Sequence, residues 1–161
     1  MKEETVVVTG AASGIGKATA DLFASRGDTI ARLAVQPGDQ ITLADVSDEK
    51  AVEAAFAKIG RIDILVNNAG IAVRKNALEI TREEWDRVMA VNVSGMFLCS
   101  RIAARSMKQN GGGAIVNLAS IMGFSGGLFP NPAYQTSKGA VVNLTRALAL
   151  EFAPFNITVN A

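Results

Sequence analysis

Hydrophobic and polar positions along this chain follow two spacings in turn, which predicts alternating strands and helices. Short apolar runs rich in β-branched residues, typical of strands buried in a parallel sheet, occur at residues 5–9, 41–44, 62–66, 114–118 and 157–160. Apolar residues at helical spacing occur at residues 17–26, 48–58, 81–109 and 133–152. The pattern predicts a single α/β domain spanning residues 1–161.

Local signals mark several helix ends. Gly27 supplies a C-terminal stop for the first helix, and Ser47 is expected to cap the helix at residues 48–58. Thr81 and Glu84 have the spacing of a capping box, which predicts the start of the long helix.

The composition excludes several classes of protein. The chain has 161 residues, 49% hydrophobic and 19% charged, with a formal net charge of +1. These values indicate a globular domain. Because no basic block and no membrane-length apolar run occurs, we expect neither a nucleic-acid partner nor a membrane span. The only cysteine is Cys99, so no internal disulfide can form, which favours a cytoplasmic protein.

The chain contains no histidine. This excludes Ser-His-Asp hydrolases and ordinary zinc hydrolases, and we predict no metal site. Any proton transfer must use Tyr, Lys, Asp or Glu.

The strand at residues 5–9 passes directly into a glycine-rich turn. Gly10, Gly14 and Gly16 lie in it together with Ser13 and Ile15, and a helix follows. Glycines permit close approach of a ligand to the backbone, and a helix N-terminus attracts anions. The turn therefore predicts a dinucleotide phosphate site; the alternative is a tight strand–helix turn without a ligand.

Polar residues follow two more predicted strands, at the edge where open parallel sheets bind ligands. Asp45-Val46 ends one strand, and Asn67-Asn68-Ala69-Gly70 follows the next. The two asparagines and the glycine of the second stretch suit close contact with a ligand; the alternative is an ordinary polar loop. Asn92 interrupts an apolar stretch of predicted helix, so it is either a hydrogen-bonded core amide or a site residue.

Tyr134 and Lys138 are four residues apart on a predicted helix and therefore share one face. An ammonium at that range favours the phenolate, so the phenol can exchange a proton with an alcohol or carbonyl. Ser120 follows the strand at residues 114–118 and lies near its carboxyl end. Taken alone, the Tyr–Lys pair is typical of an amphipathic helix surface; the other motifs favour a site.

In order and approximate spacing, these motifs resemble the short-chain dehydrogenase/reductase family over nearly the whole chain. The resemblance implies a Rossmann-type doubly wound parallel sheet. It also implies hydride transfer between a nicotinamide dinucleotide, NAD or NADP, and a small-molecule carbonyl or secondary alcohol.

The resemblance implies roles for the matching residues. Tyr134 would be the general acid or base, and Lys138 would bind the nicotinamide ribose and favour the phenolate. Ser120 would hydrogen-bond the substrate oxygen, and Asn92 would hold a water that links Lys138 to solvent. The implied cofactor-binding residues are Gly10, Ser13, Gly14, Ile15, Gly16, Asp45, Val46, Asn68, Ala69, Gly70, Tyr134 and Lys138.

The chain departs from the family pattern in three respects. The second strand has no terminal acid or base to read the adenosine ribose, which leaves NAD and NADP open. Ser13, where members that prefer NADP often carry a basic residue, favours NAD. Ser120 lies fourteen residues before Tyr134, one more than the family implies.

Residues 28–40 are too few for a second strand and a crossover helix, which needs at least about 10–12 residues by itself. Residues 27–30 resemble the start of that strand, whereas residues 31–34 resemble the end of the helix. We therefore expect one segment to be absent between Ile30 and Ala31. We expect a second segment, which would contact the substrate, to be absent after Ala161. A continuous backbone from Gly27 to Ile41 would contradict the first expectation.

The predicted activity is that of a 3-oxoacyl reductase or a sugar or polyol dehydrogenase. The alternative is a non-catalytic dinucleotide-binding regulatory protein on the same fold. We also expect a homotetramer, because the two long helices carry apolar residues on more than one face. These residues are Met96, Phe97, Ile102, Met107, Val141, Leu144, Leu148 and Phe152.

Overall fold

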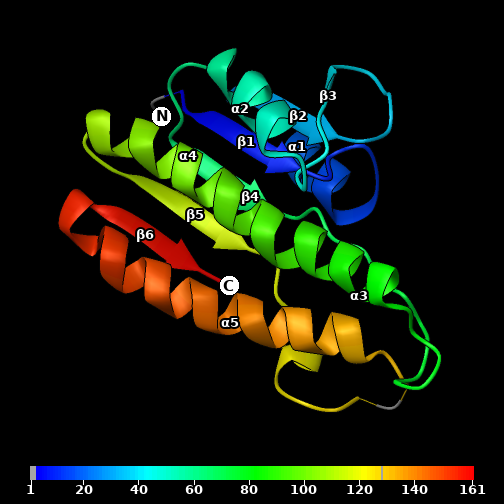
Figure 1. The fold of residues 1–161 in the computed structure, drawn as a ribbon. Helices are drawn as coiled ribbons and strands as arrows, with labels where there is room; N and C mark the ends of the chain where they lie inside the picture. The colour runs from blue at the N-terminus through cyan, green and yellow to red at the C-terminus, as the bar shows by residue number, and fades with distance from the viewer. Residues whose placement is uncertain (1–2, 128) are drawn as a thin grey trace.

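The computed structural model describes residues 3–127 and 129–161, and this part of the chain contains one sheet of six parallel strands (Figure 1). The strands are β1 (Thr5–Thr9), β2 (Thr29–Ala34), β3 (Ile41–Leu43), β4 (Ile64–Asn67), β5 (Gly113–Asn117) and β6 (Ile157–Asn160). The α-helices are α1 (Gly14–Ser25), α2 (Glu49–Ala57), α3 (Arg82–Met89), α4 (Met96–Gln109) and α5 (Pro132–Phe152). The strand order is β3-β2-β1-β4-β5-β6, so the predicted Rossmann-type fold is confirmed.

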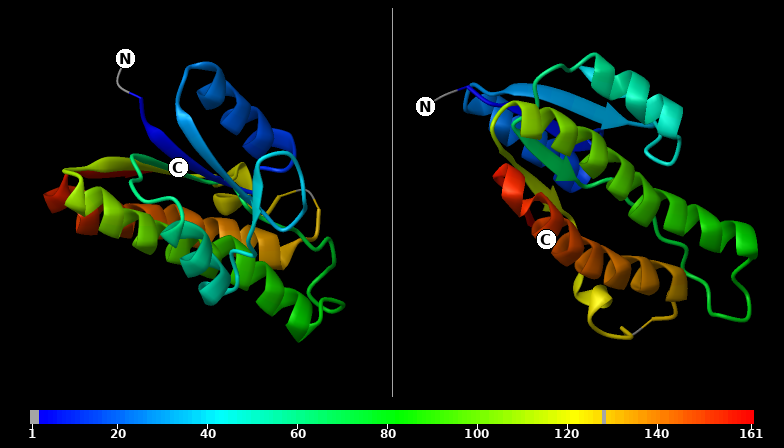
Figure 2. Two further views of the ribbon diagram at one scale, coloured as in Figure 1. Left: turned by 90° about the horizontal axis from the view of Figure 1, so that it is seen from above. Right: turned by 60° about the vertical axis from the view of Figure 1, so that its left-hand side comes forward.

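Helices lie on both faces of the sheet, but unequally (Figure 2). Residues of α2, α4 and α5 pack with Val7, Leu33, Leu65 and Ile115 in the larger buried cluster. The smaller cluster contains Val6, Val8 and Val66 with Ala20 of α1. We call these the closed face and the open face. Because a strand directs successive side chains to opposite faces, β1 with its fully buried valines contributes to both.

Strand β2 overturns the expectation for residues 30–34. Ile30 and Ala31 lie inside one unbroken strand and pair with Val6 and Val7 of β1. Residues 31–34 are therefore not the end of a helix, and the expected break between Ile30 and Ala31 is wrong. The reason is tertiary: β2 has hydrogen-bonding neighbours on both sides, β1 and β3, and such pairing overrides local helix preference.

The connection from β2 to β3 contains no helix. Residues 35–40, all of them described, form bends and turns, and yet β3 runs parallel to β2. Parallel neighbours are usually joined by a dozen or more residues, so this connection turns sharply, with Gln40 at φ +55°. A strand and a crossover helix do not both fit between Gly27 and Ile41, as predicted: the strand is present and the helix is not.

The helix caps differ from the sequence expectation at one place. Asp48 caps α2, and its carboxylate accepts from the N–H groups of Lys50 and Ala51. Ser47, the expected cap, instead donates to Asp45. A carboxylate accepts hydrogen bonds from two N–H groups more strongly than a hydroxyl does. The cap is therefore Asp48, one residue after the expected Ser47.

The long helix predicted at residues 81–109 is confirmed in its start and extent. Thr81 and Glu84 form the capping box, with hydrogen bonds of 3.2 and 3.0 Å. A π-helical turn, Ala90–Gly95, joins α3 to α4 without a break. No helix in the described part of the chain combines the length and apolarity that crossing a membrane requires.

Candidate active site

The glycine turn between β1 and α1 lies against the loop after β4. Asn68 Nδ2 donates to the carbonyl oxygens of Thr9 at 3.0 Å and Gly10 at 3.2 Å, and the N–H groups of Asn68 and Ala69 donate to Thr9 Oγ1. A Cβ at Gly16 would lie 2.4 Å from Gly10 O, and Gly10 itself has φ +66°. These two glycines are required for the turn to pack.

Gly14, the first residue of α1, lies beside open space instead of packed atoms. It has φ +54°, and a Cβ there would meet no described heavy atom within 4 Å. Ser13 precedes it as the N-cap and makes no side-chain capping bond, and the first turn of α1 carries no acidic residue. The first N–H groups and the positive end of the helix dipole are thus available to an anion.

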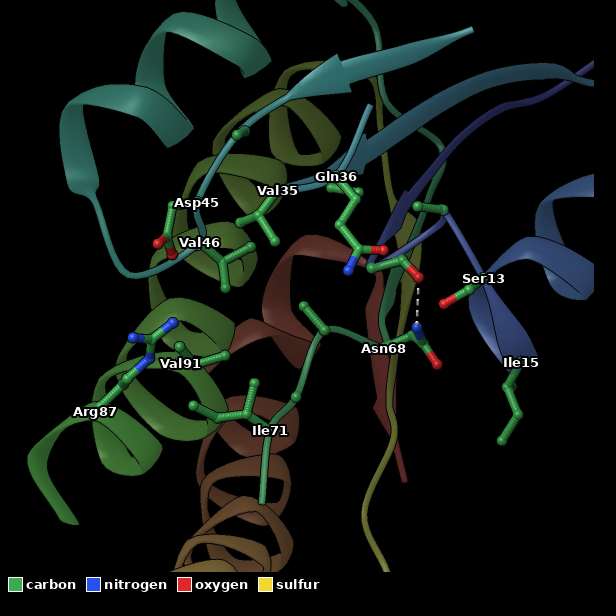
Figure 3. A pocket seen from close by; sticks show the side chains of 16 residues that line it. Ser13, Ile15, Val35, Gln36, Asp45, Val46, Asn68, Ile71, Arg87 and Val91 are labelled. Atoms are coloured by element: carbon green, nitrogen blue, oxygen red, sulfur yellow. Dashed lines mark hydrogen bonds between the residues drawn. The ribbon is translucent and has the colours of Figure 1, made fainter. Parts of the chain in front are cut away.

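A cavity of about 400 Å³ opens beside this turn, at the carboxyl edge of the sheet (Figure 3). This volume is in the range of small-molecule sites. The predicted cofactor residues that line it are Gly10, Ser13, Ile15, Asp45, Val46, Asn68, Ala69 and Gly70. Four predicted residues do not: Gly14 and Gly16 shape the turn, and Tyr134 and Lys138 lie on α5.

The lining is largely apolar or uncharged. Among the described lining residues, Asp45 and Arg87 are the only charged ones. Figure 3 shows both near Val46 at one end of the cavity, with Ser13 and Ile15 at the other end. The cavity therefore has an anion-attracting end at α1 and a second end with one acid and one base.

Tyr134 and Lys138 lie in the first turns of α5. Lys138 is only 4% exposed; its Nζ donates to the carbonyl oxygen of Leu118, just after β5, and lies 5.6 Å from the centre of the Tyr134 ring. Burial lowers the pKa of Lys138 from its ordinary 10.5. A buried ammonium is costly, and none of the described carboxylates pairs with this one. Such a group indicates function rather than packing.

Ser120 caps a 3₁₀ turn, η2 (Ile121–Gly123), and its Oγ accepts from the N–H of Met122 at 3.2 Å. A Cβ at Gly123 would lie 2.7 Å from the carbonyl oxygen of Lys138. The turn therefore packs directly on the helix that carries Tyr134 and Lys138. The structure brings Ser120 to this helix through the contact at Gly123.

Asn92 lies in the π-helical turn and is completely buried. Its Oδ1 accepts from the N–H of Ile71 at 2.8 Å, and its Nδ2 donates to Ile71 O and to Ser137 Oγ. A Cβ at Gly70 would lie 3.4 Å from Asn92 Oδ1 and 3.8 Å from Lys138 Nζ. Asn92 is thus a hydrogen-bonded core amide that lies beside Lys138. Both of its N–H donors are used within the protein, so its side chain positions the loop after β4.

A second buried polar group lies on the closed face. Asn67 Nδ2 donates to Ser100 Oγ and to Asn117 Oδ1, both at 2.9 Å, and Asn117 Nδ2 donates to Thr145 Oγ1 at 3.0 Å. All four residues are buried. Because Asn67 and Asn117 pair as the last residues of β4 and β5, the group ties α4 and α5 to the sheet at its carboxyl edge.

Sequence reasoning did not assign roles to several residues of this region. Thr9 could have been identified from the sequence, because it is a polar residue at the end of a predicted strand. Gln36 lies in the segment that had no assignment, and Arg87 is one of several charged residues on a helix. Both line the cavity through tertiary proximity that spacing does not reveal. Across the described residues, no group of three or more His, Cys, Asp or Glu side chains could hold a metal ion.

The sequence pattern of one family, described as short chain dehydrogenase, matches residues 4–161. The NAD-dependent glycerol dehydrogenase of Listeria innocua is 41% identical over 99% of this chain and 68% of its own length. The galactitol 2-dehydrogenase (L-tagatose-forming) of Cereibacter sphaeroides is 43% identical over 96% of this chain and 67% of its own length. The glycerol dehydrogenase alignment covers 175 positions, more than the 161 residues here, so that relative has residues without a counterpart in this chain.

The fold has close counterparts among solved structures. The crystal structure of a short chain dehydrogenase from Mycobacterium smegmatis superposes with a TM-score of 0.93 at 31% identity. The superposition covers 99% of this chain and 74% of that protein.

Proposed function

The chain belongs to the short chain dehydrogenase family and is an oxidoreductase, and on this premise we propose that it oxidises a polyol or sugar alcohol with NAD. Two of its relatives are named glycerol dehydrogenase and galactitol 2-dehydrogenase. Neither of these names supports the 3-oxoacyl reductase that the sequence left open, so polyols and the corresponding ketoses are the preferred substrate class.

One observation carries the proposal: the buried ammonium of Lys138 beside the Tyr134 ring. The ammonium donates to a backbone carbonyl and pairs with none of the described carboxylates, so its positive charge remains available to a negatively charged group that forms beside it. A non-catalytic binding protein on this fold has no need of such a pair. The site therefore supports catalysis rather than regulation alone.

In the proposed reaction, the phenolate of Tyr134 takes the proton of the substrate hydroxyl as the carbinol carbon loses its hydride. Ser120 Oγ hydrogen-bonds the same substrate oxygen and holds it next to the phenol. Lys138 stabilises the phenolate and binds the nicotinamide ribose, and Asn92 keeps the loop at Gly70 and Ile71 against α5. When bound, the nicotinamide supplies the hydride acceptor. Carbonyl reduction is the reverse, with Tyr134 as the acid.

The residues of the cavity fit a nicotinamide dinucleotide. The open space before Gly14 and the start of α1 suit the pyrophosphate. Gly10, Gly16 and Asn68 hold this turn, while Asp45, Val46, Ala69 and Gly70 line the space beside it. Ser13 offers no charge for the extra phosphate of NADP, which supports NAD, as does the name of the glycerol dehydrogenase.

The proposal is tested by the rise in NADH absorbance when the purified chain is mixed with NAD and a panel of glycerol, galactitol, sorbitol and simple secondary alcohols. Protein-dependent NADH formation that is fastest with polyols would support it. Turnover restricted to 3-hydroxyacyl thioesters would show that the proposed substrate class is wrong. Turnover restricted to NADP would show that the proposed cofactor is wrong.

We also propose a homo-oligomer that pairs through α4 and α5. Met96, Met107, Val141, Leu148 and Phe152 are buried within the chain, so much of the apolar surface that suggested assembly belongs to the core. The support that remains is a cavity of about 200 Å³ between the two helices and the exposure of Phe97 and Leu150. Sedimentation as a monomer at micromolar concentration would exclude a stable tetramer.

A cytoplasmic location is part of the proposal. Burial raises the pKa of the Cys99 thiol to about 12, so this cysteine is unreactive and structural. Because the one cysteine of this chain is a buried free thiol, an oxidising compartment would add no disulfide within the chain. Microscopy of the full-length tagged protein tests this.

A further inference from the structure

We infer that Asn117 and Thr145 are positioning residues: their hydrogen bond fixes α5 along the end of β5 and so sets where Lys138 and Tyr134 lie. The inference rests on the proposed function, in which Tyr134 transfers the proton and Lys138 stabilises the phenolate. Asn117 is the last residue of β5 and is buried. Its Nδ2 donates to Thr145 Oγ1 at 3.0 Å, and that hydroxyl donates to the carbonyl oxygen of Val141 at 2.8 Å. The bond therefore joins the strand to the helix that carries the proposed catalytic pair.

Two adjacent residues at the end of β5 hold this helix at two points. Leu118 follows Asn117, and its carbonyl oxygen accepts the hydrogen bond from Lys138 Nζ. Lys138 and Thr145 are seven residues apart on α5, which corresponds to two turns and about 10 Å along one face of the helix. Two bonds at this separation fix the position of the helix along its axis and its direction relative to the strand.

The start of α5 also has a close neighbour on its other contact surface, the turn η2. A Cβ at Gly123 would lie 2.7 Å from the carbonyl oxygen of Lys138, so the backbone of the turn packs on the backbone of the helix. Ser120 caps this turn. A shift of α5 along its axis would therefore change how Tyr134 lies relative to Ser120, as well as the bond made by Lys138.

The apolar contacts of α5 do not supply this precision. Leu148 and Phe152 pack in the larger buried cluster. Hydrophobic burial is non-directional, so it holds the helix against the sheet and permits small shifts along it. A buried hydrogen bond is lost when its partners separate, and the unpaired groups then cost free energy. The bond between Asn117 and Thr145 therefore resists such shifts.

Stability alone does not explain this polar junction. Replacing both partners of a buried hydrogen bond with apolar groups of the same shape can be nearly neutral. Asn67 Nδ2 donates to Asn117 Oδ1, whereas Asn67 Oδ1 has no hydrogen-bond partner among the described residues, which is a cost. The carbonyl oxygen of Asn67 accepts from the N–H of Leu118 at 2.9 Å. The junction is thus continuous with the residue that holds Lys138.

The kinetic test compares the full chain with Thr145→Val, which keeps the shape of the side chain and removes its hydroxyl. Thr145→Ser restores the hydroxyl. Ser100→Ala is the matched control, because Ser100 of α4 accepts the other bond from Asn67 at 2.9 Å. We expect Thr145→Val to lower kcat for alcohol oxidation roughly tenfold, since a displacement of about 1 Å can cost about 10²-fold.

The KM for NAD should change by no more than about threefold in Thr145→Val, because the proposed dinucleotide contacts lie mainly at the glycine turn and the cavity. Thr145→Ser and Ser100→Ala should turn over like the wild type. All rates are measured well below the melting temperature of each variant, so that lost stability by itself does not lower kcat.

A second measurement does not depend on turnover. The buried ammonium of Lys138 should give its own NMR signal in protein with isotope-labelled lysine side chains, and Lys138→Met should remove that signal. We expect the signal to shift in Thr145→Val and to keep its wild-type position in Thr145→Ser and Ser100→Ala. An unshifted signal or an unchanged kcat in Thr145→Val would overturn the inference, as would equal changes in Ser100→Ala. A wild type that oxidises no alcohol would refute the proposed function, and the NMR comparison would still decide the positioning.

Discussion

The closed and open faces of the sheet differ in how completely the described residues cover them. On the closed face, α2, α4 and α5 bury a continuous cluster that reaches from Leu33 to Val159. On the open face, the buried cluster is confined to the strands beside α1. Strand β5 makes this visible: Ile115 is fully buried, whereas its neighbour Val116 is 38% exposed. Parallel sheets are usually covered on both faces.

The difference shows where a polar site can be built. The closed face contains the hydrogen-bonded group around Asn67 and Asn117, and α5 carries the buried Lys138. A buried polar group needs partners that packing holds in place; α4 supplies Ser100 and α5 supplies Thr145. The open face contains an arginine instead: Arg32, nine-tenths buried, pairs with Asp21 of α1 at 2.7 Å. That ion pair joins α1 to β2 and contributes no group to the proposed catalytic residues.

The largest effect is expected from removing one oxygen atom on the closed-face helix α5. Tyr134→Phe should lower kcat by roughly 10²–10⁴, the usual contribution of a general acid or base. NAD affinity, measured by calorimetry, should stay near that of the wild type, because the phenol acts in the transition state. A variant with near-normal turnover would show that another group transfers the proton.

Two neighbouring residues of β5 test the comparison directly. Ile115→Ala removes a fully buried side chain from the closed face and should lower the free energy of unfolding by about 2–4 kcal/mol. Val116→Ala, on the open face, should lower it by roughly 0.5 kcal/mol. Urea unfolding monitored by circular dichroism measures both. Equal losses would indicate that something covers the open face in solution.

Lys138→Met should abolish turnover and yet raise the melting temperature at neutral pH, since the buried ammonium is destabilising. Each kcal/mol corresponds to about 2–4 °C in a domain of this size. Burial lowers the pKa of Lys138, so between its folded value and 10.5 the unfolded chain binds more protons, and wild-type stability rises with pH. The advantage of the variant should therefore shrink as the pH approaches 10.5. A gain in melting temperature that does not change with pH would contradict the conclusion that burial of the Lys138 ammonium is destabilising.

The smallest effect concerns the open-face ion pair. Hydrogen bonds from Lys17 and Arg32 lower the pKa of Asp21 below its usual 3.8. The stabilisation is therefore complete above pH 3.8 and is lost as the pH falls through the folded pKa. Asp21→Asn should lower the melting temperature slightly at pH 7, and the difference from the wild type should disappear in acid. Glu53→Gln on the exposed surface of α2 serves as the control.

Local pattern predicted most of the elements and the residue types of the site. Strand β1, the glycine turn and the capping box at Thr81 each depend on neighbours in sequence, so spacing revealed them. The Tyr134–Lys138 pair on α5 could be found because helical periodicity places residues four apart on one face. Residues 31–34 were misread, because pairing with β1 and β3, and not their own propensity, makes them a strand.

The sequence by itself determined the fold class, the glycine turn before α1 and the candidate proton donor. The tertiary structure alone decided that Asn92 is held by Ile71 and Ser137 and that Lys138 is buried under the loop after β5. It also decided that Asp45 and Arg87 line the same end of one cavity. The physical reason is range: periodicity and capping act within a few residues, whereas burial, desolvation and the lining of a cavity depend on segments that meet only when the sheet assembles.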